Sequence, residues 1–223
     1  MKTLTRLTLA LAIAAIGIRA AERFDMTVRE DFFAGYAGNR VALDRAMKAC
    51  EDALAINPKH AEALVWHGSG TVYLSGRAFQ KGDYATGGQL WGQGTKEMDT
   101  AVELAPENVA VLIPRGATLL SSADSLPTAQ GRLLLEKGVA DYEKVRKIQA
   151  PRFEKLSGHS RGELLFGLAD GYKRLDRPEA RDVFEALLAV GKSSGHQEQA
   201  EKFLAGEPYA KSSMGCTGCH TGK

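Results

Sequence analysis

Apolar residues recur at helical spacing along most of the chain from residue 27 to residue 205. The row Leu165, Leu168, Tyr172 and Leu175, for example, would fill one face of a helix. Sustained alternation of apolar and polar residues, the pattern of a half-buried strand, is hard to find. The sequence therefore predicts an all-α fold with helices near residues 27–37, 40–56, 59–76, 83–104, 107–122, 128–149, 160–175, 178–190 and 195–205.

Short polar motifs mark some of the expected helix boundaries. Thr27 with Glu30, and Ser160 with Glu163, have the capping-box spacing, in which each side chain accepts a hydrogen bond from the other residue's backbone N–H. We therefore expect a helix to begin at each of these two places. Gly191 follows an apolar helical row and is expected to end that helix.

One of the predicted helices is unusually rich in glycine. Gly87, Gly88, Gly92 and Gly94 all fall within residues 83–104, and each costs about 1 kcal/mol of helix stability relative to alanine. Two outcomes are open. Either small residues are needed there for close packing against a neighbour, or the helix is broken.

Residues 1–20 have a pattern of their own. Lys2 and Arg6 precede an uncharged apolar run from residue 7 to residue 18, and the small residue Ala20 follows. A run this short does not span about 30 Å of hydrocarbon, which takes about 20 residues. An export signal removed near Ala20 is therefore favoured over an uncleaved anchor. The mature chain, with no membrane span, is then expected to be periplasmic or secreted by a bacterium.

Composition adds few constraints. The chain has 223 residues, 44% of them apolar and 25% charged, which is enough for one sizeable core or two small ones. Its formal net charge of +2 is too small to indicate nucleic-acid binding. A mixed-charge run over residues 136–155 is most simply a solvated helix face, although four of its cations could form a docking patch: Arg146, Lys147, Arg152 and Lys155.

Two similar phrases end one predicted helix and open the next. The segment ALAINP at residues 53–58 is followed later by a similar segment, AVELAP, at residues 101–106. Counted back from each proline, the sequence resembles the second helix of a tetratricopeptide repeat, which has small, bulky and small residues at three packing positions. Those positions are Ala46, Cys50 and Ala53 in the first copy and Gly94, Met98 and Ala101 in the second.

The helices after the two prolines resemble the first helix of the following repeat. Their pattern positions are Leu64, Gly68 and Thr71 after the first proline, and Leu112, Gly116 and Leu119 after the second. One further unit of the pattern is present at Leu168, Ala169, Tyr172, Ala180, Phe184 and Leu187. The family's usual leucine is His67 in one unit and Arg115 in the next, and the prolines are farther apart than the family's repeat of about 34 residues. The resemblance implies that residues 27–205 are a helical domain of antiparallel hairpins, stacked as a degenerate α-solenoid with a concave surface for a peptide or protein.

The strongest chemical signal lies at the C-terminus. The sequence CTGCH at residues 216–220 has the form C-x-x-C-H, which resembles the haem attachment motif of c-type cytochromes. The resemblance implies one covalently attached haem c, with thioether bonds to Cys216 and Cys219 and with His220 as the proximal iron ligand. Residues 206–223 are then an extended tail that bears the haem, and the helical domain has to supply its pocket.

Three other chemistries compete for this cluster. A redox dithiol normally begins a helix in an α/β fold, and no strand precedes the pair. A structural zinc ion needs a fourth ligand, usually from a second Cys/His pair at short spacing, and that pair is missing. A disulfide between Cys216 and Cys219 leaves His220 unexplained. The third cysteine, Cys50, fits a packing position and is read as a small buried residue.

The second axial ligand of such a haem is not settled by the sequence. His67 is the first choice, because it replaces an expected leucine next to Trp66, although a core or groove histidine with a local partner is the simpler reading. His196 is the second choice, while His60 and His159 fall at turns and are most simply solvated. A vacant position is the remaining alternative.

These features predict an exported haem protein that transfers electrons, with the helical array docking a redox partner protein or peptide. Two alternatives remain open. In the first, the helical array is the functional part, and the protein is a protein-interaction scaffold with a secondary haem. In the second, the haem iron has an open site, and the protein is a peroxidase-like enzyme. No nucleic-acid partner is expected.

Overall fold

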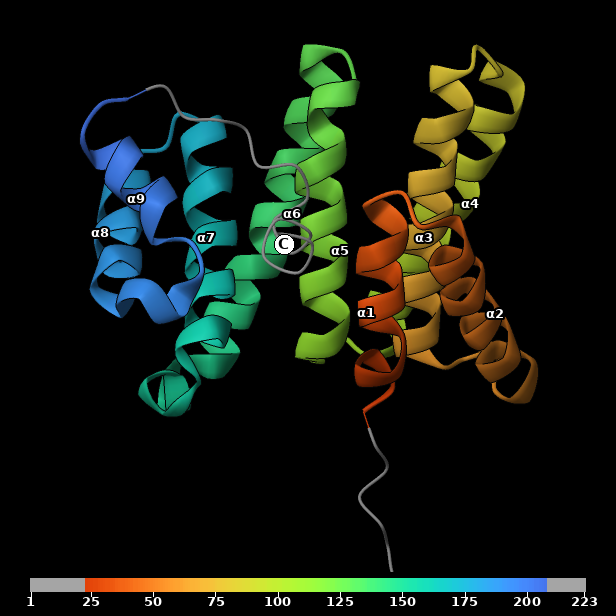
Figure 1. The fold of residues 1–223 in the computed structure, drawn as a ribbon, viewed down its shortest axis with the longest axis horizontal. Helices are drawn as coiled ribbons and strands as arrows, with labels where there is room; N and C mark the ends of the chain where they lie inside the picture. The colour runs from red at the N-terminus through yellow and green to blue at the C-terminus, as the bar shows by residue number, and fades with distance from the viewer. Residues whose placement is uncertain (1–22, 208–223) are drawn as a thin grey trace, which may run out of the picture.

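A computed structural model describes residues 23–207 of the chain. All the regular elements in this part of the chain are helices, so the predicted all-α class is confirmed (Figure 1). The α-helices are α1 (Phe24–Tyr36), α2 (Arg40–Ile56), α3 (Ala61–Gln80), α4 (Tyr84–Leu104), α5 (Val109–Ser122), α6 (Thr128–Gln149), α7 (Gly158–Arg174), α8 (Ala180–Val190) and α9 (Gln197–Leu204). Three short 3₁₀ helices connect them: η1 (Ala123–Ser125), η2 (Ala150–Lys155) and η3 (Gly191–Ser194).

The two predicted capping boxes are wrong. Helix α1 begins before Thr27, and the Thr27 hydroxyl donates a hydrogen bond to the Phe24 carbonyl oxygen at 2.7 Å. Helix α7 begins after Ser157, whose Oγ accepts a hydrogen bond from the Ser160 backbone N–H at 3.1 Å. In both cases the helix extends towards the N-terminus beyond the expected cap. Gly191 does end α8, with φ at +76°, a conformation that suits glycine.

The helices form four antiparallel hairpins in chain order, α1–α2, α3–α4, α5–α6 and α7–α8, and α9 packs on α8 (Figure 1). Within the described residues, extensive contacts join only helices of the same hairpin or of consecutive hairpins. The first helix of each hairpin, α1, α3, α5 or α7, contacts the first helix of the next. No helix among residues 23–207 is both long and apolar enough to cross a membrane.

Helix α5 separates two hydrophobic cores. Val111 and Leu119 belong to the core of the N-terminal half, together with residues of α1 to α4. Leu112 and Leu120 face a second core formed with α6 to α9. Neighbouring positions of α5 therefore point into opposite cores, and the helix is the shared wall between them.

The glycine-rich helix α4 is continuous, because close packing requires some of its glycines. A Cβ added at Gly94 would lie 2.6 Å from the Gly68 carbonyl oxygen, and one added at Gly68 would lie 2.7 Å from that of Gly94. The backbones of α3 and α4 touch at this point. Gly88 and Gly92, in contrast, face open space. The close-packing alternative is therefore confirmed at Gly94, and Gly87 has the same role against the ring of Phe79.

Arg115 forms a buried ion pair at the position where the repeat pattern has a leucine. Its Nε and Nη2 donate hydrogen bonds to the two carboxylate oxygens of Asp141 at 2.7 and 2.6 Å, and both side chains are at least nine-tenths buried. Its Nη1 also donates to Asp99 at 3.0 Å. The bidentate pair links α5 to α6, and Asp99 extends the contact to α4.

Candidate functional site

The predicted haem-attachment residues, Cys216, Cys219 and His220, lie outside the described residues, as does the predicted signal peptide at residues 1–20. The prediction that they bind haem therefore stays a prediction. Within residues 23–207, no cluster of three or more histidine, cysteine or acidic side chains could hold a metal ion.

His67, the first choice for a distal ligand, lies between α3 and α4. Its side chain is 13% exposed, and its Nδ1 is 2.7 Å from the Glu97 carboxylate. Glu97 is also 2.9 Å from the amide nitrogen of Gln93, so His67 takes part in a local polar network. Its role as an iron ligand is not tested by the described residues.

His196, the second choice, is 3% exposed and stacks on Phe166, with ring centroids 4.1 Å apart. Burial, and to a smaller extent the nearby His159, lower the pKa of His196 to about 4. The imidazole therefore stays neutral at physiological pH. It borders a small cavity of about 30 Å³ at the junction of α5, α6 and α7.

The other sequence candidates have structural surroundings. The His60 Nδ1 accepts a hydrogen bond from the Ala63 backbone N–H at 3.2 Å and thereby caps α3. His159, 45% exposed, lies 3.3 Å from Glu163. Cys50 is fully buried, and burial raises the pKa of its thiol to about 12. The prediction that Cys50 is a buried packing residue is confirmed.

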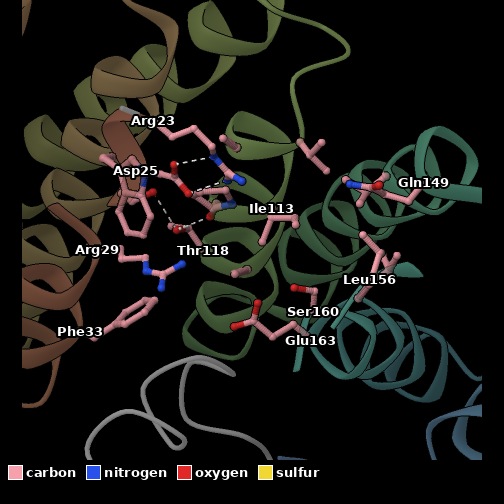
Figure 2. Close-up of a pocket in the computed structure, with 18 of the residues that line it drawn as sticks. Arg23, Asp25, Arg29, Phe33, Ile113, Thr118, Gln149, Leu156, Ser160 and Glu163 are labelled. Atoms are coloured by element: carbon pink, nitrogen blue, oxygen red, sulfur yellow. Dashed lines mark hydrogen bonds and ion pairs between the residues drawn. The ribbon is translucent and has the colours of Figure 1, made fainter. Parts of the chain in front are cut away.

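A groove of about 400 Å³ lies in the described part of the chain (Figure 2). We call it the inner groove. Helices α1, α3, α5 and α7 line most of it, and the end of α6 and the segment around η2 complete the lining, so it lies mainly on the side formed by the first helix of each hairpin. Figure 2 shows Arg23, Asp25, Arg29 and Phe33 on one wall and Gln149, Leu156, Ser160 and Glu163 across from them.

The floor of the inner groove is mostly apolar and comes from α5. Ile113 and Ala117 lie one helical turn apart and both line it. Pro114, inside the helix, lines it too. Because proline has no N–H, the helical hydrogen bond from residue 114 to the Ala110 carbonyl oxygen is missing. Ala110 is also a lining residue, so the interruption of the helix lies at the floor.

Three arginines stand at the edges of the inner groove. Arg23 is neutralised by Asp25, to which it donates two hydrogen bonds at 3.0 and 2.7 Å. Arg29 approaches Glu30 at 3.3 Å. Arg152, exposed, donates a hydrogen bond to the neutral side-chain oxygen of Gln149 at 2.6 Å, and no ion pair of Arg152 is found in the described part of the chain. Its charge is therefore available to an anion.

Two buried donors beside the inner groove lack partners. The Tyr36 hydroxyl and the Trp66 Nε1–H are inaccessible to solvent and have no hydrogen-bond partner among the described residues. Burial raises the pKa of Tyr36 far above its usual value, so the phenol is protonated. Both residues line the groove, and Trp66 stacks on Phe32 with ring centroids 5.1 Å apart.

The lining of the inner groove mixes apolar and charged side chains. An apolar floor is edged by three arginines and by the carboxylates of Asp25 and Glu163, and the described lining residues include no histidine, methionine or cysteine. Its volume falls within the range of about 300–1,000 Å³ that is typical of small-molecule sites. Sequence reasoning named Trp66, Arg152, Ser160 and Glu163 for other reasons and did not group them into one site, because the walls come from segments more than a hundred residues apart.

Comparison of the chain with protein-family models, with curated proteins and with solved structures finds no match. Its function therefore has to be inferred from its own residues.

Proposed function

We propose that this chain is an exported c-type haem protein that transfers single electrons. The observation that carries the proposal is the C-x-x-C-H motif, with Cys216 and Cys219 as thioether anchors and His220 as the proximal iron ligand. A haem attached there would supply one-electron redox chemistry. The N-terminal pattern supports export to the periplasm or the medium, where haem attachment in bacteria takes place.

The protein part of the proposal is a degenerate tetratricopeptide-like solenoid that docks a redox partner. Its support is the order of packing, since each first helix contacts the first helix of the next hairpin. The packing positions that the resemblance assigns to α4, namely Gly94, Met98 and Ala101, are all buried. So are Ala46 and Cys50 of α2, while Ala53 is half-buried.

The test is a pyridine haemochrome spectrum of the full chain expressed with cytochrome maturation factors. We expect one covalent haem per chain, and we expect its loss in the variant with both Cys216→Ser and Cys219→Ser. The variant His220→Ala should keep both thioether sites but lose the normal axial ligation, which shifts the Soret band. The variant Cys50→Ser is the matched control, because that thiol is buried in a core. A wild-type chain without covalent haem would contradict the proposal.

The inner groove favours a second candidate function, a scaffold that binds a peptide or protein while the haem is secondary. Its support is a cavity that is apolar at the floor and bears three arginines and two carboxylates at the edges. Pull-down partners that persist unchanged in the double cysteine variant would favour the scaffold. Partners that bind only the haem-loaded chain would favour electron transfer.

A further inference from the structure

We propose that the inner groove is the seat of the chain's own C-terminal segment, residues 208–223, with its haem lying against the floor formed by α5. This inference rests on the proposed function, because the segment is taken to carry haem. It assigns the groove to one occupant, an internal one, in place of a foreign peptide.

The chain is long enough for this placement. The first turns of α7 line the groove through Ser160 and Glu163, and η3 packs against these turns, with Ser194 in close contact with Gly162. Helix α9 starts just after η3 and has 8 residues, so it ends about 12 Å further along. The peptide from residue 207 to residue 216 then spans up to about 30 Å.

The chemistry of the inner groove matches a haem on two counts. The porphyrin ring is flat and apolar, and the floor offers Ile113, Pro114 and Ala117 to it. The two propionates are anionic, and the edges offer the guanidinium groups of Arg29 and Arg152. The Arg152 charge meets no carboxylate among the described residues, and the Arg29 side chain is 36% exposed.

The residues that line the inner groove also limit which side chains could bind the iron of a haem seated there. None of the described residues that line the inner groove offers an imidazole or a thioether to iron. His67 takes part in the α3–α4 network with Glu97 and is not a lining residue. For a haem seated in the groove, we therefore expect replacement of His67 by alanine to leave the Soret band and the rate of carbon monoxide binding to the ferrous protein unchanged. A loss of low-spin character in His67→Ala would contradict the placement.

The direct test is photo-crosslinking in the full-length, haem-loaded chain. A benzophenone amino acid replaces Ser160, an exposed residue of the groove wall, so that the replacement does not disturb the core. We expect mass spectrometry to find crosslinks from position 160 to peptides of residues 208–223. The control places the same group at Ala140, an exposed residue of α6 that does not line the groove, and should give at most about a tenth of that yield.

Charge reversal gives a second, independent readout. The double variant Arg29→Glu and Arg152→Glu should lower the crosslink yield from position 160 at least about fivefold. The control Arg181→Glu changes an exposed arginine of α8 that pairs with Glu185 outside the groove, and should leave the yield unchanged.

The possible failures are distinguishable. A chain that carries covalent haem but gives no crosslink to residues 208–223 overturns this inference and leaves the proposed function standing. Crosslinks to a second copy of the chain, or to a co-purified peptide, in place of the tail also overturn it. A chain without covalent haem overturns the proposed function itself, whatever the crosslinks show.

Discussion

Arg115 illustrates what the sequence could and could not reveal about single residues. Its place in the repeat pattern marked it as a departure, but its partner Asp141 lies on the next helix and has no motif of its own. Removal of one partner from a buried pair typically costs about 3–5 kcal/mol, because the other charge is left uncompensated. The burial of Cys50, in contrast, followed directly from its position between small residues at helical spacing.

His196 makes the stability of the protein depend on pH. Its pKa is about 4 in the folded chain and about 6.5 when unfolded, so the unfolded state binds a proton between these values and the folded state does not. Stability is therefore complete above about pH 7 and falls as the pH drops towards 4. We expect a loss of about 2 kcal/mol between pH 7 and pH 5, measured by urea unfolding.

The variant His196→Phe should remove most of this pH dependence, because the phenyl ring keeps the stacking on Phe166 and does not titrate. The exposed His159→Gln is the control and should keep most of it, since burial is the larger cause of the shift. An unchanged slope in His196→Phe would show that other groups titrate instead.

At the scale of helices, hydrophobic spacing predicted every α-helix of the described residues to within a few positions, although it placed two starts wrongly. Spacing identifies the buried face of a helix. The start depends on which polar side chain reaches a free backbone N–H, and Ser157 does this in place of Ser160. The pattern also left open whether α4 is whole, because the answer depends on the Gly68 backbone of another helix.

The contact between α3 and α4 gives opposite expectations for two glycines of one helix. Gly94→Ala should destabilise the fold by about 1–3 kcal/mol, because the added methyl group collides with the Gly68 carbonyl oxygen. Gly92→Ala, two residues away and facing open space, should stabilise it by up to about 1 kcal/mol through helix propensity. Thermal unfolding of both variants measures the difference. Equal effects would mean that the helices can separate at no cost.

At the scale of the whole molecule, the inner groove was beyond the reach of sequence reasoning. The resemblance to tetratricopeptide repeats implied a concave surface, but it did not indicate the arginines of the groove, or that its described lining residues include no imidazole or thioether. These properties depend on how residues of α1 come to face those of α7. That relation is set by the intervening hairpins and not by any local pattern.

The two cores give a test at the same scale. Leu112→Ala removes a fully buried side chain from the core of α6 to α9 and should cost about 2–5 kcal/mol. Hydrogen exchange should then rise more in α6 to α8 than in α1 to α3. Val111→Ala, the preceding residue, faces the other core and should reverse this order. The same exchange pattern in both variants would mean that the two cores open together.

Because the hairpins pack one after another, the two walls of the inner groove are held apart by the helices between them. Within residues 23–207, no extensive contact joins the α1 and α7 walls of the inner groove, which are connected through α3, α5 and α6. A small rotation at any intervening interface is therefore magnified at the walls. Pro114 removes one backbone hydrogen bond of α5 in the middle of this series, so we expect bending at that turn to change the width of the opening.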